Sequence, residues 1–364
     1  MIVNNSELSD LYTDYLITST RYTTATGLSA LLNGEISHDK ITRLLSKGEA
    51  FNSKTLWLAS KPLVREFETG DGCISIDDSI QEKPYTDENE LNCWHWDHTK
   101  GRSVKGVNFI TAFYYHRGAN MPLATEFILK SKKQKDPKTG KMKRVNDKTK
   151  NQLYRELLQT VENNQVKYKY VLNDIWFSSS ENMRFIKEEL SKDFAMAIKK
   201  NRKVVLNKSN KLQGKYVGIG SLELEPGAVQ EVYFEQVEFP VLLVKQVFKN
   251  EDGSTGILYL VSSDTNLTYE QITTIYQKRW KVEEFHKSVK HNTSLAKAPT
   301  KTITTQLSHF YASIIAFVKL ELMSFRTNMN HFALKSRIYL RGLNVSMIEL
   351  EELSTIHLRK QVTF

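Results

Sequence analysis

Hydrophobic and polar residues alternate at several places in the first two thirds of the chain, a pattern typical of β-strands. The alternation begins just after Gly72 and returns in Gly106–His116, Leu123–Lys130 and Lys167–Asn173. Apolar residues at helical spacing fall between the last two strands, in Asn151–Asn163, and Ser178 is placed to cap a further helix. Strands interleaved with helices predict a mixed α/β sheet with helices packed against it.

The pattern changes again toward the C-terminal end. Residues from about Phe194 to Ser262 are rich in strands, which indicates a β-rich insertion into the α/β part. Two long helices are predicted after it, at about Tyr269–Lys290 and Thr304–Ser324. The second is apolar on most sides, so we expect it in a core.

The first part of the chain reads as helical and polar. Two short helices across Asn33-Gly34-Glu35 fit either a DNA-binding helix-turn-helix or an ordinary helical hairpin. Together these changes of pattern divide the chain into five segments. They are an N-terminal helical region (1–70), a first α/β part (71–193), the β-rich insertion (194–262), a second α/β part (263–325) and a C-terminal tail (326–364).

Composition narrows the class of protein. The 364 residues are 40% hydrophobic and 10% aromatic, which excludes disordered and collagen-like chains. The longest apolar runs are far shorter than the roughly 18 residues of a membrane span, and the first residues do not resemble a secretory signal. Two cysteines, Cys73 and Cys93, are too few for a disulfide framework. We therefore expect a soluble protein of a reducing compartment, the cytoplasm, and no association with membranes.

The excess positive charge is concentrated in one segment. The formal charge of the chain is +10, and Lys130–Lys150 holds ten basic residues against two acids, a net charge of +8. The segment has turn signals and few apolar residues, so we expect an exposed loop or hairpin. Such a run either stays solvated or contacts a phosphate backbone, and charge alone does not separate the two.

Two aspartates follow predicted strands. Asp77 comes after Cys73–Ile76, and Asp174 comes after Tyr168–Asn173. Functional side chains collect beyond strand ends because the sheet holds the loops there rigidly. A lone aspartate in that place more often caps a turn or the next helix.

A polar stripe follows on the helix predicted at Tyr269–Lys290. Tyr276, Arg279, Glu283 and Lys290 are separated by three, four and seven residues. At helical periodicity these side chains project within about 60° of one another. One carboxylate among two cations and a phenol suits an anion bridged by a metal. The alternative is a solvated helix face with an Arg279–Glu283 pair.

The spacing Tyr-x2-Arg-x3-Glu-x6-Lys is that of the YREK signature, and the chain resembles bacterial insertion-sequence transposases of the DDE type that carry it. The resemblance runs from about Gly72 to Ser324. It implies a ribonuclease H-like fold in which Asp77, Asp174 and Glu283 are catalytic and bind metal. Asp78 stays an alternative first ligand, although Ser79 fits the family motif Asp-x-Thr/Ser better with Asp77.

The resemblance also implies a cofactor and partners. The metal would be Mg²⁺, for which Mn²⁺ can substitute, because hard divalent cations choose carboxylate oxygen. Tyr276, Arg279 and Lys290 would bind DNA near the scissile bond. The partners would be double-stranded DNA, both element ends and target, and a second copy of the chain in a synaptic homodimer. Water would attack first, and the freed 3′-hydroxyl would then attack either the opposite strand, giving a hairpin, or target DNA.

Two other activities remain open from the sequence: a metal-dependent DNA nuclease without strand transfer, and a non-catalytic DNA-binding derivative.

Aromatic residues are a further feature of the sequence that bears on DNA binding. Trp94 and Trp96 are expected in a turn near DNA, and Trp176 could stack on a base, although core packing is the more common role. Cys93, His95 and His98 lack the spacing of an ordinary zinc site.

Overall fold

A computed structural model describes residues 4–137 and 140–361 of the chain. The chain forms two compact units. One consists of Ser53–Lys287, and the other combines Met1–Asn52 with Ser288–Phe364. The helix α9 (Trp280–Asn292) runs from one unit into the other.

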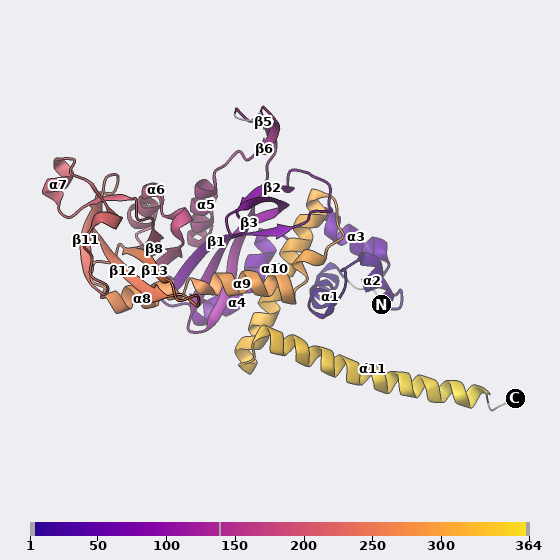
Figure 1. Cartoon of the computed structure of the whole chain (residues 1–364). Helices are drawn as coiled ribbons and strands as arrows, with labels where there is room; N and C mark the ends of the chain where they lie inside the picture. Colours follow the sequence, from indigo (N-terminus) through magenta and orange to yellow (C-terminus); the bar gives the residue numbers. More distant parts are fainter. Residues whose placement is uncertain (1–3, 138–139, 362–364) are drawn as a thin grey trace. The chain divides into compact units, whose positions relative to one another are not determined.

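A large mixed sheet forms the centre of the unit Ser53–Lys287 (Figure 1). Its strands are β1 (Cys73–Glu82), β2 (Asn92–Asp97), β3 (Arg102–His116), β4 (Ala119–Phe127), β7 (Tyr170–Asn173), β8 (Asp193–Ile198), β9 (Lys203–Val205), β10 (Val217–Gly218), β11 (Val229–Phe234), β12 (Val241–Lys249) and β13 (Thr255–Ser262). They are ordered β10-β9-β11-β12-β13-β8-β7-β1-β3-β2, with β4 also paired to β3. The predicted mixed α/β class is confirmed.

Strand direction changes at β1. This strand is antiparallel to β3 but parallel to β7, and β7 is in turn parallel to β8. The apolar start of β1, Cys73–Ile76, is buried, as expected for a central strand covered on both faces. The parallel strands β1 and β7 therefore lie side by side, and β1 continues to Glu82 beyond the point where β7 ends at Asn173.

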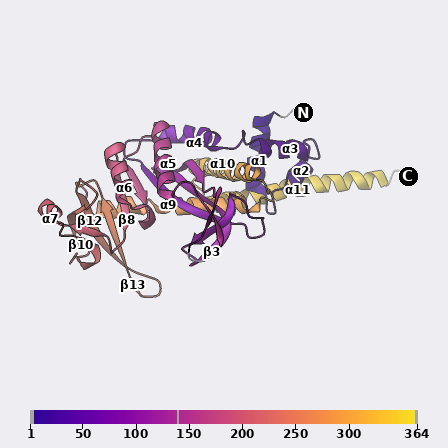
Figure 2. The same ribbon diagram turned by 90° about the horizontal axis from the view of Figure 1, so that it is seen from above.

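Helices cover both faces of the sheet. The helices of this unit are α4 (Ser53–Phe67), α5 (Lys150–Asn163), α6 (Ser180–Arg184), α7 (Lys208–Leu212) and α8 (Tyr269–Gln277), with the first part of α9. The helices α5 and α6 lie side by side, since Arg155 donates to Asn182 across 2.8 Å (Figure 2). Tyr154 of α5 donates to Asn173 at the end of β7 across 2.8 Å.

The opposite face of the sheet packs against α8. Ile272 and Tyr276 of α8 lie in one core cluster with Ala197, Leu242 and Leu260. A neighbouring cluster joins strands β1, β7 and β8 and is covered by Leu267 and Ile275. Side chains on alternate positions of β7 thus point toward α5 or toward α8, and this alternation decides which face each acidic residue reaches.

The strands of residues 194–262 continue the main sheet, because β13 pairs with β8 in antiparallel fashion. The predicted strand-rich character of this segment is confirmed. The predicted division of the chain into five segments stays a prediction. The helix expected from Ser178 begins later, at α6, with Ser179 as its cap.

The helix predicted at Tyr269–Lys290 is two helices, so the prediction of one continuous helix is wrong. The chain breaks between α8 and α9 at Lys278 and Arg279. Backbone bonds there follow three-residue spacing, such as Arg279 N–H to Tyr276 O at 2.9 Å and Val282 N–H to Arg279 O at 3.2 Å. In this tighter turn the side chain of Arg279 points toward the sheet.

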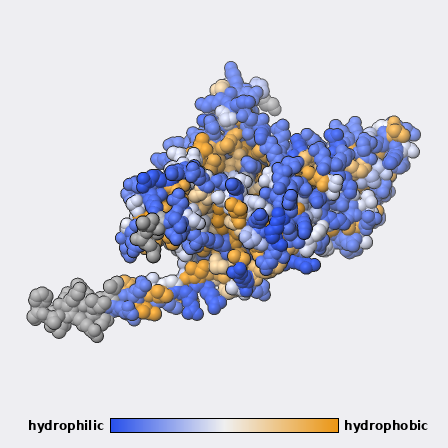
Figure 3. Space-filling view, turned by 180° about the vertical axis from the view of Figure 1, so that it is seen from behind, coloured by the Kyte–Doolittle hydropathy of each residue, from blue (hydrophilic) through white to orange (hydrophobic). Residues whose placement is uncertain are grey.

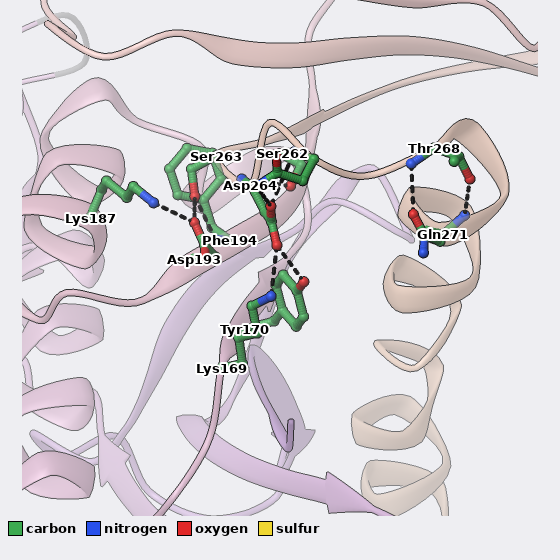
Figure 4. Close-up of polar contacts among 11 residues, drawn as sticks. Lys169, Tyr170, Lys187, Asp193, Phe194, Ser262, Ser263, Asp264, Thr268 and Gln271 are labelled. Atoms are coloured by element: carbon green, nitrogen blue, oxygen red, sulfur yellow. Dashed lines mark hydrogen bonds and ion pairs between the residues drawn. The ribbon is translucent and has the colours of Figure 1, made fainter. Parts of the chain in front are cut away.

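A buried polar network fixes the starts of β7 and β8 against the end of β13 (Figure 4). Asp264 accepts hydrogen bonds from Lys169 Nζ and Tyr170 Oη, each at 2.8 Å. Asp193 accepts from Lys187 at 2.6 Å and from Ser263 at 2.8 Å. The network lies at the end of β7 opposite to Asp174 and so holds the strand that delivers this residue.

The basic segment forms a separate two-stranded hairpin, β5 (Lys132–Lys135) and β6 (Met142–Val145). Its strand residues are exposed or half-buried, which confirms the predicted exposed hairpin. Lys138, one of the ten basic residues, lies outside the described part of the chain. In Figure 3 the projecting tip carries hydrophilic side chains.

The second unit is helical. It contains α1 (Asn5–Thr18), α2 (Ala25–Leu31), α3 (His38–Lys47), α10 (Ile303–Thr327) and α11 (His331–Gln361). The mostly buried α10 is the predicted core helix, and Tyr12 of α1 contacts its His309 at 3.0 Å. The pair α2 and α3 packs across the turn at Asn33-Gly34, and its helix-turn-helix role stays a prediction. Across the described residues, no helix is long and apolar enough to span a membrane.

Candidate active site

Asp77 lies in the middle of β1, beside Thr111 of β3, so the prediction that Asp77 follows the end of this strand is wrong. Because strand side chains alternate, Asp77 shares a face with Cys73, which packs toward α8. Asp78 points to the other face, where Lys150 at the start of α5 pairs with it at 2.7 Å. The two aspartates that the sequence left as alternatives therefore lie on opposite sides of the sheet.

Asp174 is the residue directly after β7. Parallel pairing places Ile76 beside Asn173, so the next residues, Asp77 and Asp174, are neighbours at one sheet end. Asp174 also caps the short helix η1 (Ile175–Phe177), because its carboxylate accepts the N–H of Trp176 at 2.9 Å. Asp174 therefore both caps η1 and lies beside Asp77.

Arg279 connects Glu283 with this pair of aspartates. Its Nη2 donates to Glu283 Oε1 at 2.7 Å, and its Nη1 lies 4.0 Å from Asp77 Oδ2. The guanidinium also lies over the rings of Tyr276 and Trp280, at 5.6 and 5.4 Å. Its buried Nε has no hydrogen-bond acceptor among the described residues.

Two carboxyl groups of the site have raised pKa values. Burial, and after it the negative charges of Asp174 and Asp78, raise the pKa of Asp77 to about 8. Burial also raises the pKa of Asp174. Like charges held together in a buried place favour a cation between or beside them. Arg279 supplies part of that positive charge.

The donor chemistry fits a hard divalent cation. Asp77, Asp174 and Glu283 offer carboxylate oxygens only, the ligand type that Mg²⁺ and Mn²⁺ prefer. The pair Asp77 and Asp174 is already side by side, whereas Glu283 is bound to Arg279. Accordingly, no three His, Cys, Asp or Glu side chains of the described residues converge as a ready-made metal site.

The predicted DNA-binding residues are only partly brought together. Tyr276 is buried, and burial raises the pKa of its hydroxyl to about 12. Tyr276, Arg279 and Glu283 lie around one point at the junction of α8 and α9. Lys290 lies two turns further along α9 and belongs to the other compact unit.

Several residues beside the site escaped sequence reasoning. Lys150 and Lys199 line a pocket of about 340 Å³ together with Trp176. The expectation of core packing for Trp176 is wrong, because the side chain is 46% exposed. Lys150 could have been noticed because it lies at the end of the basic run. Nothing in the sequence singles out Lys199, because its position near Trp176 depends on the turn after β8.

Comparison with known protein families gives two matches. A family model described as DDE superfamily endonuclease matches residues 5–218, and a model described as archaeal putative transposase ISC1217 matches residues 119–331. Each covers more than half of the chain; the first includes Asp77 and Asp174, and the second includes Asp174 and Glu283.

Two further comparisons add little to the family models. Among solved structures, endonuclease V from Bacillus subtilis aligns with a TM-score of 0.24 and 9% identity, over 78% of this chain and 98% of that one. No curated protein matches the sequence. On the strength of the two family models, the chain belongs to the DDE superfamily of endonucleases and transposases.

Proposed function

We propose that this protein is an insertion-sequence transposase that cuts DNA at element ends and joins the freed ends to new DNA. The observation that carries the proposal is the meeting of Asp77, inside β1, with Asp174, directly after the end of β7, with Glu283 tied to Asp77 through Arg279. Membership in the DDE superfamily supports DNA as the substrate.

The fold we propose for the catalytic part is ribonuclease H-like. Four strands, β1 to β4, come first in the chain, with β3 antiparallel to each of the other three, and β7 and β8 then add in parallel beside β1. The strands β9 to β13 extend that sheet before the chain returns in α8 and α9. This order supports the two-part catalytic core expected from the sequence, with the strand-rich segment between its parts.

Asp77, Asp174 and Glu283 would hold Mg²⁺, with Mn²⁺ as a substitute. When bound, the metal would neutralise charge on the attacking and leaving oxygens of the phosphodiester. The protein's own part is to hold three carboxylates on rigid elements: one inside a strand, one directly after the neighbouring strand, and one on the first turn of α9.

Arg279 and Tyr276 would position the DNA backbone. The unused Nε of Arg279 is a buried donor that a phosphate oxygen could satisfy. Glu283 would have to exchange its bond with Arg279 for a metal, which frees the guanidinium for the same phosphate. Lys290 would contact DNA further along α9, and the protein would act as a homodimer on two element ends.

The test is incubation of the purified protein with Mg²⁺ and duplex DNA that carries its candidate element ends. End cleavage followed by joined products or terminal hairpins would support a transposase. Cleavage without any joined or hairpin product would favour the nuclease, whose site is the same. Tight binding without cleavage in Mg²⁺ or Mn²⁺ would favour a non-catalytic DNA-binding protein.

A further inference from the structure

A row of exposed aromatic side chains leads to the candidate active site. Trp94 and Trp96 are alternate residues of β2 and therefore share its outward face, where they are 54% and 55% exposed. The ring of Trp96 lies 6.3 Å from that of exposed His98, and the ring of His98 lies 4.6 Å from that of Trp176. We call Trp94, Trp96, His98 and Trp176 the aromatic row.

The row begins in a basic pocket. Trp94 lines a pocket of about 700 Å³ with four cations of the hairpin and its approach, Lys130, Lys133, Lys143 and Arg144. A single acid, Glu88, lines the same pocket. Lys130 is fixed beside the first indole, because its Nζ donates to the carbonyl of Trp94 at 2.6 Å.

The row ends at the catalytic carboxylates. Trp176 lies two residues after Asp174, and its backbone N–H is the group that Asp174 caps. The ammonium of Lys199 lies over the indole of Trp176 at 5.7 Å. Lys150, which lines the same smaller pocket, pairs with Asp78, whose side chain points to the sheet face opposite to that of Asp77.

This combination fits a DNA strand whose bases are unpaired. Cations alone serve for the backbone of a duplex, in which the base faces are stacked and hidden. Exposed indoles in a row, with lysines beside them, match the two needs of a single strand: a surface on which bases stack and charge along the phosphates.

We propose that the aromatic row and its flanking cations form a binding track for single-stranded DNA. The track would guide an unpaired strand from the β5–β6 hairpin to Asp174. The proposal rests on the proposed function, because it assigns a path to a strand opened at an element end. It also makes its own claim about binding, which needs neither metal nor cleavage.

The test compares binding of single-stranded and duplex DNA in EDTA. The probe is a fluorescein-labelled oligodeoxythymidylate of about 16 nucleotides, long enough for one such site, beside a duplex of the same length. The variants are Trp94→Ala/Trp96→Ala and Trp94→Phe/Trp96→Phe. The matched control is Phe248→Ala, which removes an exposed ring on β12, away from the row.

We expect the alanine pair to weaken single-strand binding about tenfold or more and duplex binding far less, because each stacked base contributes strongly. The phenylalanine pair, which keeps two π-faces, should retain most of the affinity, and Phe248→Ala all of it. Equal losses for single strand and duplex would overturn the proposal in favour of a duplex surface. Unchanged affinity in the alanine pair would overturn it outright, and so would phenylalanine variants as weak as the alanine ones.

The same proteins with Mg²⁺ and duplex ends separate this proposal from the proposed function. If the wild type binds single-stranded DNA through the row but does not cleave the ends, the binding track is supported and the transposase function is rejected. If the wild type cleaves the ends but does not bind single-stranded DNA through the row, the transposase function is supported and the track is rejected.

Discussion

The guanidinium of Arg279 donates to the carboxylate of Glu283 across 2.7 Å at the junction of α8 and α9. The same group lies 4.0 Å from Asp77, so an internal cation stands between two carboxylates that we propose as metal ligands. The arrangement is consistent with a resting site in which a protein cation balances part of the negative charge until a divalent ion binds.

This relationship predicts how Arg279→Gln changes stability. Without metal, the variant should lose about 1–3 kcal/mol of unfolding free energy, because Glu283 and Asp77 lose a buried partner. Adding Mg²⁺ should restore more stability to the variant than to the wild type. Denaturant unfolding in EDTA and in Mg²⁺ measures both effects.

The control is Lys281→Gln, which breaks the exposed pair of Lys281 with Glu284 one turn away. It should cost less than about 1 kcal/mol in either buffer. If Arg279→Gln behaved like this control, Arg279 would not balance the carboxylates in the way proposed.

The opposite faces of Asp77 and Asp78 predict unequal variants. Asp77→Asn should abolish cleavage of element ends, since its side chain lies with Asp174 and Arg279. Asp78→Asn should leave substantial cleavage, because its side chain reaches Lys150 on the other face. Single-turnover cleavage assays compare them, and a complete loss in Asp78→Asn with activity in Asp77→Asn would reverse the assignment.

The network around Asp264 predicts a dependence of stability on pH. Burial raises the pKa of Asp264, but hydrogen bonds from Lys169 and Tyr170 outweigh it and lower the pKa to about 2. A lowered pKa in the folded state contributes stability above the unfolded value, and this contribution is lost as pH falls from about 4 to 2. Asp264→Asn should therefore cost about 1–2 kcal/mol near neutral pH and much less at about pH 2. Urea unfolding at both pH values measures the difference in unfolding free energy between the variant and the wild type. The same difference at both pH values would contradict the proposed role of Asp264.

Close packing at Gly106 predicts a stability defect. A Cβ there would meet the backbone carbonyl of Gln81 in the adjacent β1, so Gly106→Ala would force the two strands apart. We expect a loss of about 1–3 kcal/mol. Gly70→Ala is the matched control, because a Cβ at Gly70 has open space, and its thermal midpoint should stay close to that of the wild type. Equal midpoints for the two variants would refute the argument.

Much of the fold was predictable because strand and helix periods are local properties of the chain. Cys73–Ile76 and Asn151–Asn163 are visible as a strand and a helix, and the structure has them there. The break at Lys278 and Arg279 was not predictable, because apolar spacing runs through it without a proline or glycine. The position of the break instead depends on how Tyr276 packs in the core.

The candidate site was predictable only in part for a similar reason. Asp77, Asp174 and Glu283 were found from strand ends and a spaced motif, and their catalytic and metal-binding roles stay predictions. The aromatic row was not found, because His98 and Trp176 are distant in sequence and meet only in the folded sheet. Exposure of Trp176 depends on the turn at Asp174, which no periodicity shows.

The most direct measurement is the rate of Mg²⁺-dependent cleavage of duplex element ends by Glu283→Gln beside Glu284→Gln. Glu284 is the next residue of α9, is exposed, and its carboxylate pairs with Lys281. The account predicts that Glu283→Gln loses cleavage by at least about a hundredfold, whereas Glu284→Gln cuts at nearly the wild-type rate. Equal rates in the two variants would contradict the proposed triad of Asp77, Asp174 and Glu283.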